Sequence, residues 1–176
     1  MSPHLQAEIC MLNLRPVLHI LGWISCALAM VLCIPAIADG FAGNPEWEIF
    51  LEVALTTLFV GGAVVYATRS RAATEIDIRQ AFLITSLGWI VVAGFSALPF
   101  MHVGIGFSDA VFESMSAITT TGSTVLVSLD QLPPGILLWR AILQWFGGIG
   151  IIAIAILILP LLRVGGMQLF KIESSD

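Results

Sequence analysis

Residues 118–126 read ITTTGSTVL, a run of hydroxyl side chains with one glycine inside an otherwise apolar chain. The segment before it, residues 107–119 (FSDAVFESMSAIT), has Ser108 at the position expected for an N-cap and Asp109 in the first turn. A helix of that length covers roughly 20 Å at about 1.5 Å per residue, about two-thirds of a hydrocarbon core. Threonine and glycine continue a helix poorly. The sequence therefore predicts a half-helix that enters a membrane without crossing it, followed by extended chain.

The composition is that of an integral membrane protein. Of the 176 residues, 58% are hydrophobic and 11% are charged, whereas soluble domains are roughly 45–50% apolar. The net charge of −5 argues against nucleic-acid binding. The three cysteines have no metal-ligand spacing, and neither a nucleophile triad nor a phosphate-binding glycine loop is found. We therefore expect no enzyme activity and no cofactor.

Four apolar runs are each long enough to span a bilayer. They are residues 17–38, Trp47–Thr68, 81–101 and 136–162. The last is long enough to tilt or to overhang the membrane. The predicted fold is an all-α integral membrane protein with four transmembrane helices, one re-entrant pore half-helix and an extended filter.

A cleaved signal peptide is the alternative for the first run, because residues 36–38 (AIA) resemble a cleavage site. The apolar region is longer than the usual 7–15 residues and lacks a clear preceding positive cluster. We therefore expect the first run to remain as a span.

Basic residues predict the orientation of the spans. Six of the seven fall on one side, at positions Arg15, Arg69, Arg71, Arg79, Arg163 and Lys171. The other side carries acidic residues, with only the basic residue Arg140 near it: Asp39, Glu46, Glu48, Asp109, Glu113 and Asp130. The prediction is that both termini are cytoplasmic. The acids either attract cations or simply collect where basic residues are excluded.

The hydroxyl-rich loop has a physical explanation if it lines a path for a cation. Non-helical backbone is tolerated at membrane depth only where protein or water covers it. A half-helix would point its partly negative C-terminal end at such a path. Gly122 permits unusual backbone geometry, and hard oxygen ligands come from Thr119, Thr120, Thr121, Ser123 and Thr124. The alternative is a re-entrant or interfacial turn with no transport role.

The order of helix, pore helix, filter and helix resembles that of potassium channels. Their filter TVGYG corresponds to residues 120–124 (TTGST), which keep only the first threonine and the central glycine. Together with FESMSAITT before it and LPPGILLWRAILQWFGGIG after it, this filter closely resembles the first pore repeat of Trk-type (TrkH-like) bacterial potassium-uptake subunits, in the Trk/Ktr/HKT superfamily. The resemblance implies a transmembrane hairpin over residues 1–74 and a first pore repeat over residues 75–176.

The resemblance also implies a function: potassium uptake across the bacterial inner membrane, with potassium as the substrate. The potassium-coordinating positions are then Thr120, Thr121, Gly122 and Ser123, mainly through backbone carbonyls. In that family four pore repeats of one chain surround one pathway, two subunits form a homodimer, and a cytoplasmic nucleotide-binding subunit (TrkA-like) regulates it. Whether a symport mechanism couples potassium to protons or sodium is left open.

This sequence departs from the family because it carries one pore repeat instead of four. Either these residues contribute one quarter of a filter within a longer subunit, or four copies assemble a homotetrameric cation channel. A non-conducting membrane scaffold is the alternative from another class.

Two further features have alternative interpretations. Arg140 either snorkels to the outer interface beside Trp139 or pairs with Glu113 or Asp109 of the pore helix. The glycine clusters at residues 61–62 and 147–150 either permit close helix packing or make the last span flexible.

Overall fold

The computed structural model describes residues 13–69 and 76–173, which are helical apart from turns and one loop and contain no strand. The elements are α2 (Arg15–Ala42), α3 (Trp47–Thr68), α4 (Ile78–Met101), α5 (Phe107–Ile118), the 3-10 turn η1 (Leu129–Gln131) and α6 (Pro134–Glu173). Four of them, α2, α3, α4 and the first part of α6, are long and apolar enough to cross a membrane. The predicted all-α class and the four spans are confirmed.

Helix boundaries agree closely with the sequence, with two corrections. The N-cap of α5 is Gly106 in an extended conformation, so the predicted N-cap at Ser108 is wrong, although Asp109 does lie in the first turn. Helix α6 begins at Pro134, because proline has the backbone angle that a first helical turn needs. It continues to Glu173, so the predicted end at residue 162 is too early.

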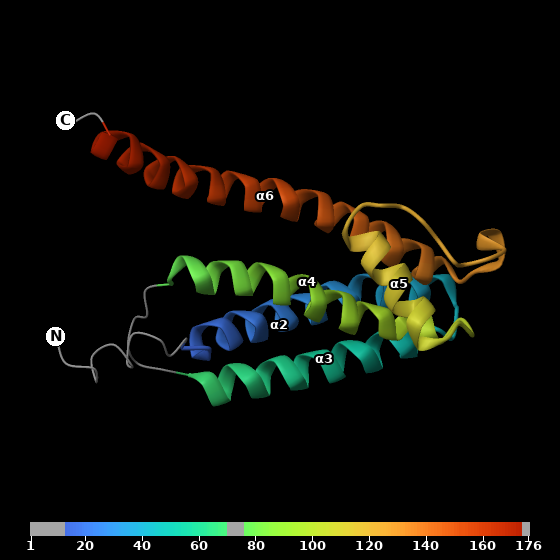
Figure 1. Ribbon diagram of the computed structural model, residues 1–176. Helices are drawn as coiled ribbons and strands as arrows, with labels where there is room; N and C mark the ends of the chain where they lie inside the picture. The colour runs from blue at the N-terminus through green and yellow to red at the C-terminus, as the bar shows by residue number, and fades with distance from the viewer. Residues whose placement is uncertain (1–12, 70–75, 174–176) are drawn as a thin grey trace.

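Helices α2, α3 and α4 run side by side, and α6 meets them at the end where the short α5 lies (Figure 1). Helix α2 packs along α3 and also contacts α4 and α6, while α5 packs between α4 and α6. Beyond this region α6 extends away from the other helices (Figure 1). The largest fully buried side chains lie where α2, α3, α4 and α6 meet: Leu32, Phe50, Phe100, Ile136 and Trp139.

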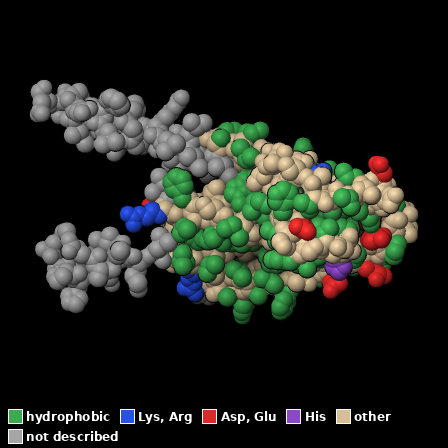
Figure 2. Space-filling model, turned by 45° about the vertical axis from the view of Figure 1, so that its right-hand side comes forward, with side chains coloured by type: hydrophobic (Ala, Val, Ile, Leu, Met, Phe, Trp, Pro, Cys, Tyr) green, Lys and Arg blue, Asp and Glu red, His purple; other side chains and the backbone are tan. Residues whose placement is uncertain are grey.

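Charged side chains separate to opposite ends of the helices. Figure 2 shows Asp and Glu side chains at one end and Lys and Arg side chains toward the other. Exposed Arg15, Arg69 and Arg79 belong to the basic end, and exposed Asp109 and Asp130 to the acidic end. Arg140 lies at the acidic end with its side chain only 17% exposed.

Asp39 ties the end of α2 to the beginning of α6. Its carboxylate is fully buried, and Oδ1 accepts a hydrogen bond of 2.8 Å from the backbone N–H of Gly135. A carboxylate at a helix N-terminus is favourable because the first N–H groups carry partial positive charge. A Cβ at Gly135 would overlap this carboxylate. The contact therefore requires glycine, and it joins the predicted hairpin to the predicted pore repeat.

Gly22 of α2 and Gly61 of α3 let the two backbones approach closely. A Cβ at Gly61 would lie 2.9 Å from the carbonyl oxygen of Gly22 and 2.9 Å from Ser25 Cβ. The neighbouring Gly62 faces open space, with nothing within 4 Å of a Cβ. The close-packing interpretation is thus confirmed for Gly61 and not for Gly62.

We predict that Gly61→Ala lowers thermal stability relative to Gly62→Ala by about 1–3 kcal/mol, the usual cost of overpacking. Both changes gain similar helix propensity, so their difference isolates the contact with α2. Thermal unfolding of the purified variants in one detergent gives this difference. Equal melting temperatures would show that the α2–α3 contact is not tight.

The candidate ion-binding loop

The loop after α5 folds back on the last turn of that helix. The carbonyl oxygen of Ser116 accepts hydrogen bonds from the backbone N–H groups of Thr121, at 3.0 Å, and Gly122, at 3.3 Å. Thr120 and Gly122 have φ values of 58° and 80°. The left-handed region costs glycine little, but for a β-branched threonine it is a strained conformation held by its surroundings. A short helix followed by non-helical chain is thus present, as the sequence predicts.

The backbone carbonyls of this loop divide into two groups. In the described part of the chain, no donor reaches the carbonyl oxygens of Thr119, Thr120 and Thr121. The carbonyl of Gly122 accepts a 2.9 Å hydrogen bond from Arg140 Nη2, and that of Ser123 accepts one of 2.6 Å from Ser116 Oγ.

All four predicted coordinating positions therefore lie together on one exposed loop. Of these four positions, Thr120 and Thr121 have carbonyls that no donor of the described residues reaches. Sequence reasoning missed the contribution of Ser116, because a contact across a turn between residues 116 and 123 leaves no periodic pattern.

The threonine hydroxyls also have different roles. Thr119 Oγ1 donates to the carbonyl of Met115 at 2.8 Å and lies 2.9 Å from Thr121 Oγ1. Since the Thr119 proton is used, the Thr121 hydroxyl donates to Thr119 and keeps its own oxygen lone pairs free. Thr124 Oγ1 instead donates to Glu113 Oε2 at 2.9 Å and accepts from the N–H of Leu126. The Thr124 hydroxyl therefore uses its proton and one of its two lone pairs within the protein.

Glu113 of α5 lies fully buried behind the loop. Its Oε2 accepts from Thr124 Oγ1 and, at 3.0 Å, from the backbone N–H of Val125, while Oε1 pairs with Arg140 Nε at 2.5 Å. A buried carboxylate is costly unless a positive charge and donors compensate it, and here both are present.

The Glu113–Arg140 pair is thereby confirmed over the two alternatives for Arg140, snorkelling and pairing with Asp109. Trp139, suggested as an interfacial anchor, is instead fully buried and donates its indole N–H to the carbonyl of Ser96 at 3.1 Å.

Gly147 of α6 sets the distance between that helix and the start of the loop. A Cβ at Gly147 would overlap the carbonyl group of Ile118, the last residue of α5. At the adjacent Gly148 the nearest atom to a Cβ is Thr120 Cγ2, 3.8 Å away, an ordinary contact. Close packing is thus required at Gly147 alone of the two.

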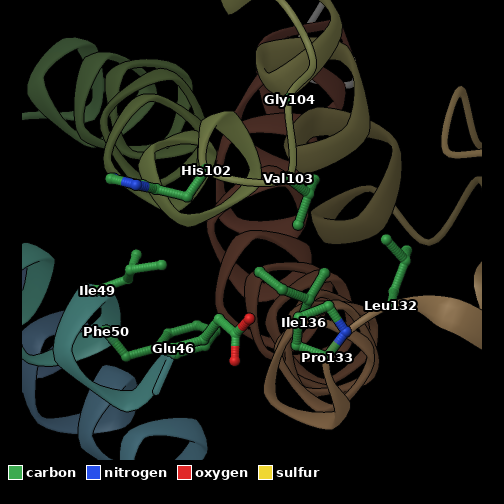
Figure 3. A pocket seen from close by; sticks show the side chains of 9 residues that line it. All are labelled: Glu46, Ile49, Phe50, His102, Val103, Gly104, Leu132, Pro133 and Ile136. Carbon is green, nitrogen blue, oxygen red and sulfur yellow. The ribbon is translucent and has the colours of Figure 1, made fainter. Parts of the chain in front are cut away.

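A cavity of about 400 Å³ lies apart from this loop, between the start of α3, the end of α4 and the start of α6. Figure 3 shows the Glu46 carboxylate directed toward Pro133 and Ile136. Its lining is mainly apolar and includes none of the predicted coordinating positions. Within residues 13–69 and 76–173, no cluster of three or more His, Cys, Asp or Glu could hold a metal ion. Cys26 and Cys33 are free thiols.

Four apolar helices, with a short helix that ends in an oxygen-rich loop, define a polytopic membrane protein. The sequence matches the TrkH family, described as cation transport proteins, over residues 46–176. This match covers well over half of the chain, and the protein belongs to the TrkH family. It is therefore a member of a transport family.

Named relatives agree with this assignment. The chain is 39% identical to the Trk system potassium uptake protein TrkI of Halomonas elongata and 38% identical to TrkH of Escherichia coli, over 92% of its length in each case. It resembles the crystal structure of the potassium transporter TrkH from Vibrio parahaemolyticus with a TM-score of 0.81 and 37% identity over 88% of this chain. The chain spans about one third of these relatives, 33% and 34% of the two sequences and 34% of the solved chain.

We predict that Gly147→Ala moves the end of α5 and the loop after it, whereas Gly148→Ala is tolerated. Overpacking against a backbone carbonyl costs about 1–3 kcal/mol, because main chain yields less readily than a flexible side chain. Thermal unfolding and limited proteolysis of the loop in the two purified variants measure the effect. Matching melting points and cleavage rates would contradict the close contact between α6 and Ile118.

Proposed function

We propose that this chain takes part in potassium uptake across the bacterial cytoplasmic membrane as part of a Trk-type transporter subunit. The observation that carries the proposal is the pair of donor-free carbonyls at Thr120 and Thr121, placed at the C-terminal end of a short helix. Carbonyl oxygens replace the water shell of an alkali cation, and a helix C-terminus favours positive charge. The relatives' names point to potassium as the substrate.

The proposed coordinating positions are Thr120, Thr121, Gly122 and Ser123, acting through their carbonyls. The carbonyls of Gly122 and Ser123 each accept one protein hydrogen bond, which leaves a second lone pair for an ion. The Thr121 hydroxyl is a further oxygen ligand. All these groups come from the chain itself, so the proposed function requires no cofactor and no enzymatic step.

The assembly follows from the geometry of a filter. One loop supplies one side of a path, so a complete ring needs further loops. We propose that residues 1–74 form the hairpin, that residues 75–176 form one pore repeat, and that the remaining repeats belong to the same subunit. The subunit then forms a homodimer and binds a TrkA-like regulatory protein. A homotetramer of this chain and a non-conducting scaffold are the competing arrangements.

Charge separation supports the proposed orientation. The described basic side chains lie mainly at the end opposite the loop (Figure 2), as expected for a cytoplasmic side with both chain ends. The loop would then open to the outer side of the inner membrane, where acidic side chains raise the local concentration of cations.

Growth at limiting potassium tests the function directly. A host without its own uptake systems is given either this 176-residue chain or the longest natural reading frame that contains it. Rescue by the longer protein alone supports the arrangement in which this chain contributes one quarter of a filter within a longer subunit. Rescue by the short chain supports a homotetramer. Failure of both, at normal membrane abundance, supports the scaffold and ends the transport proposal.

We predict that Gly122→Ser, made in whichever protein rescues growth, changes the ratio of potassium to sodium uptake. A side chain at φ 80° costs about 1–2 kcal/mol, and relaxation of that strain moves the neighbouring carbonyls. Gly104→Ser is the matched control, because Gly104 has φ 84° and lies before α5, outside the loop. Isotope uptake per amount of membrane protein is the measurement. If both variants had the same ratio of potassium to sodium uptake, the assignment of Gly122 to the ion path would be rejected.

A further inference from the structure

Four consecutive residues of the loop are each tied to the protein behind them. Gly122 accepts from Arg140, Ser123 accepts from Ser116, and Thr124 and Val125 both donate to Glu113. Three of these four anchors depend on one ion pair, because Arg140 holds Gly122, Glu113 holds Thr124 and Val125, and the two side chains also pair with each other. The pair therefore holds the loop residues on both sides of Ser123, which are Gly122 and Thr124.

Arg140 makes these contacts with two different nitrogens. Nε pairs with Glu113 Oε1, and Nη2 donates to the Gly122 carbonyl at 2.9 Å. Because a guanidinium group is planar, a contact at one nitrogen restricts the direction in which another nitrogen can donate a hydrogen bond. The orientation of the Gly122 carbonyl is thereby coupled to the position of Glu113 in α5 and of Arg140 in α6.

The charge balance fits a site beside a cation path. A lone guanidinium next to coordinating carbonyls would repel a cation, but Glu113 lies fully buried against it and compensates its charge. The pair therefore supplies a strong hydrogen bond to a loop carbonyl without leaving an uncompensated positive charge.

We propose that Arg140 is a positioning residue for ion selectivity, which it exerts by orienting the Gly122 carbonyl while Glu113 neutralises and aims its guanidinium. This proposal rests on the proposed transport function and assigns discrimination between potassium and sodium to a residue outside the loop. Discrimination follows from the number and field of the carbonyls that an ion meets. Loss of the hydrogen bond from Arg140 to the Gly122 carbonyl changes both the number of these carbonyls and their field.

Arg140→Lys is the test, made in the longest natural reading frame that supports potassium-dependent growth. A lysine keeps the positive charge beside Glu113 but offers one nitrogen in place of two. We expect normal membrane abundance and a roughly three- to tenfold fall in the ratio of potassium to sodium uptake, because a hydrogen bond from a charged donor is lost. Ser114→Ala is the control, since the buried hydroxyl of Ser114, next to Glu113 in α5, has no hydrogen-bond partner among the described residues.

A merely structural role predicts another result: less protein in the membrane with an unchanged ratio per protein, and this outcome overturns the proposal. If Arg140→Lys fails to accumulate, the double variant Glu113→Gln with Arg140→Gln removes both buried charges and is measured instead. An unchanged ratio in that variant also overturns the proposal. Gly122→Ser distinguishes the proposed filter from the proposed role of Arg140. If Gly122→Ser alters the ratio of potassium to sodium uptake and Arg140→Lys does not, the filter proposal is kept and the role of Arg140 is rejected.

Discussion

The buried carboxylate of Glu113 is the constraint on which the loop depends. A carboxylate without solvent must be matched by a positive charge and by donors, and an unmatched one costs several kcal/mol. Here the match comes from three directions: Arg140 of α6, and the Thr124 hydroxyl and Val125 N–H of the loop. One side chain of the short helix thus holds both the following helix and the segment between them.

This arrangement lets an irregular backbone persist next to helices that present mainly apolar faces. The carbonyls and N–H groups behind the loop find partners within the protein, which lipid does not supply. The carbonyls of Thr120 and Thr121 have no partner among the described residues, and both residues are exposed. Rigid support on one side and free oxygens on the other are what a cation site needs, because ordering the ligands beforehand lowers the cost of binding.

Helix contacts at a few glycines place this loop relative to the rest of the chain. Gly147 brings α6 against the end of α5, Gly135 accommodates the Asp39 carboxylate, and Gly61 brings α3 against α2. Each contact is specific to its glycine, since neighbouring Gly62 and Gly148 have room for a side chain. Of the three, the contact between Gly135 and Asp39 connects the first two long helices to α6.

The sequence by itself determined the membrane class, the four spans, the short helix and the place of the oxygen-rich loop. Hydrophobic run length and helix-breaking residues are local properties, so the sequence shows them directly. Only the tertiary structure decided which loop oxygens are free, that Arg140 pairs with Glu113, and that Trp139 is buried. The structure also showed that the N-cap of α5 is Gly106 and not Ser108, and that α6 continues to Glu173. Those outcomes depend on which groups compete for the same partner across helices, and composition and spacing do not record that competition.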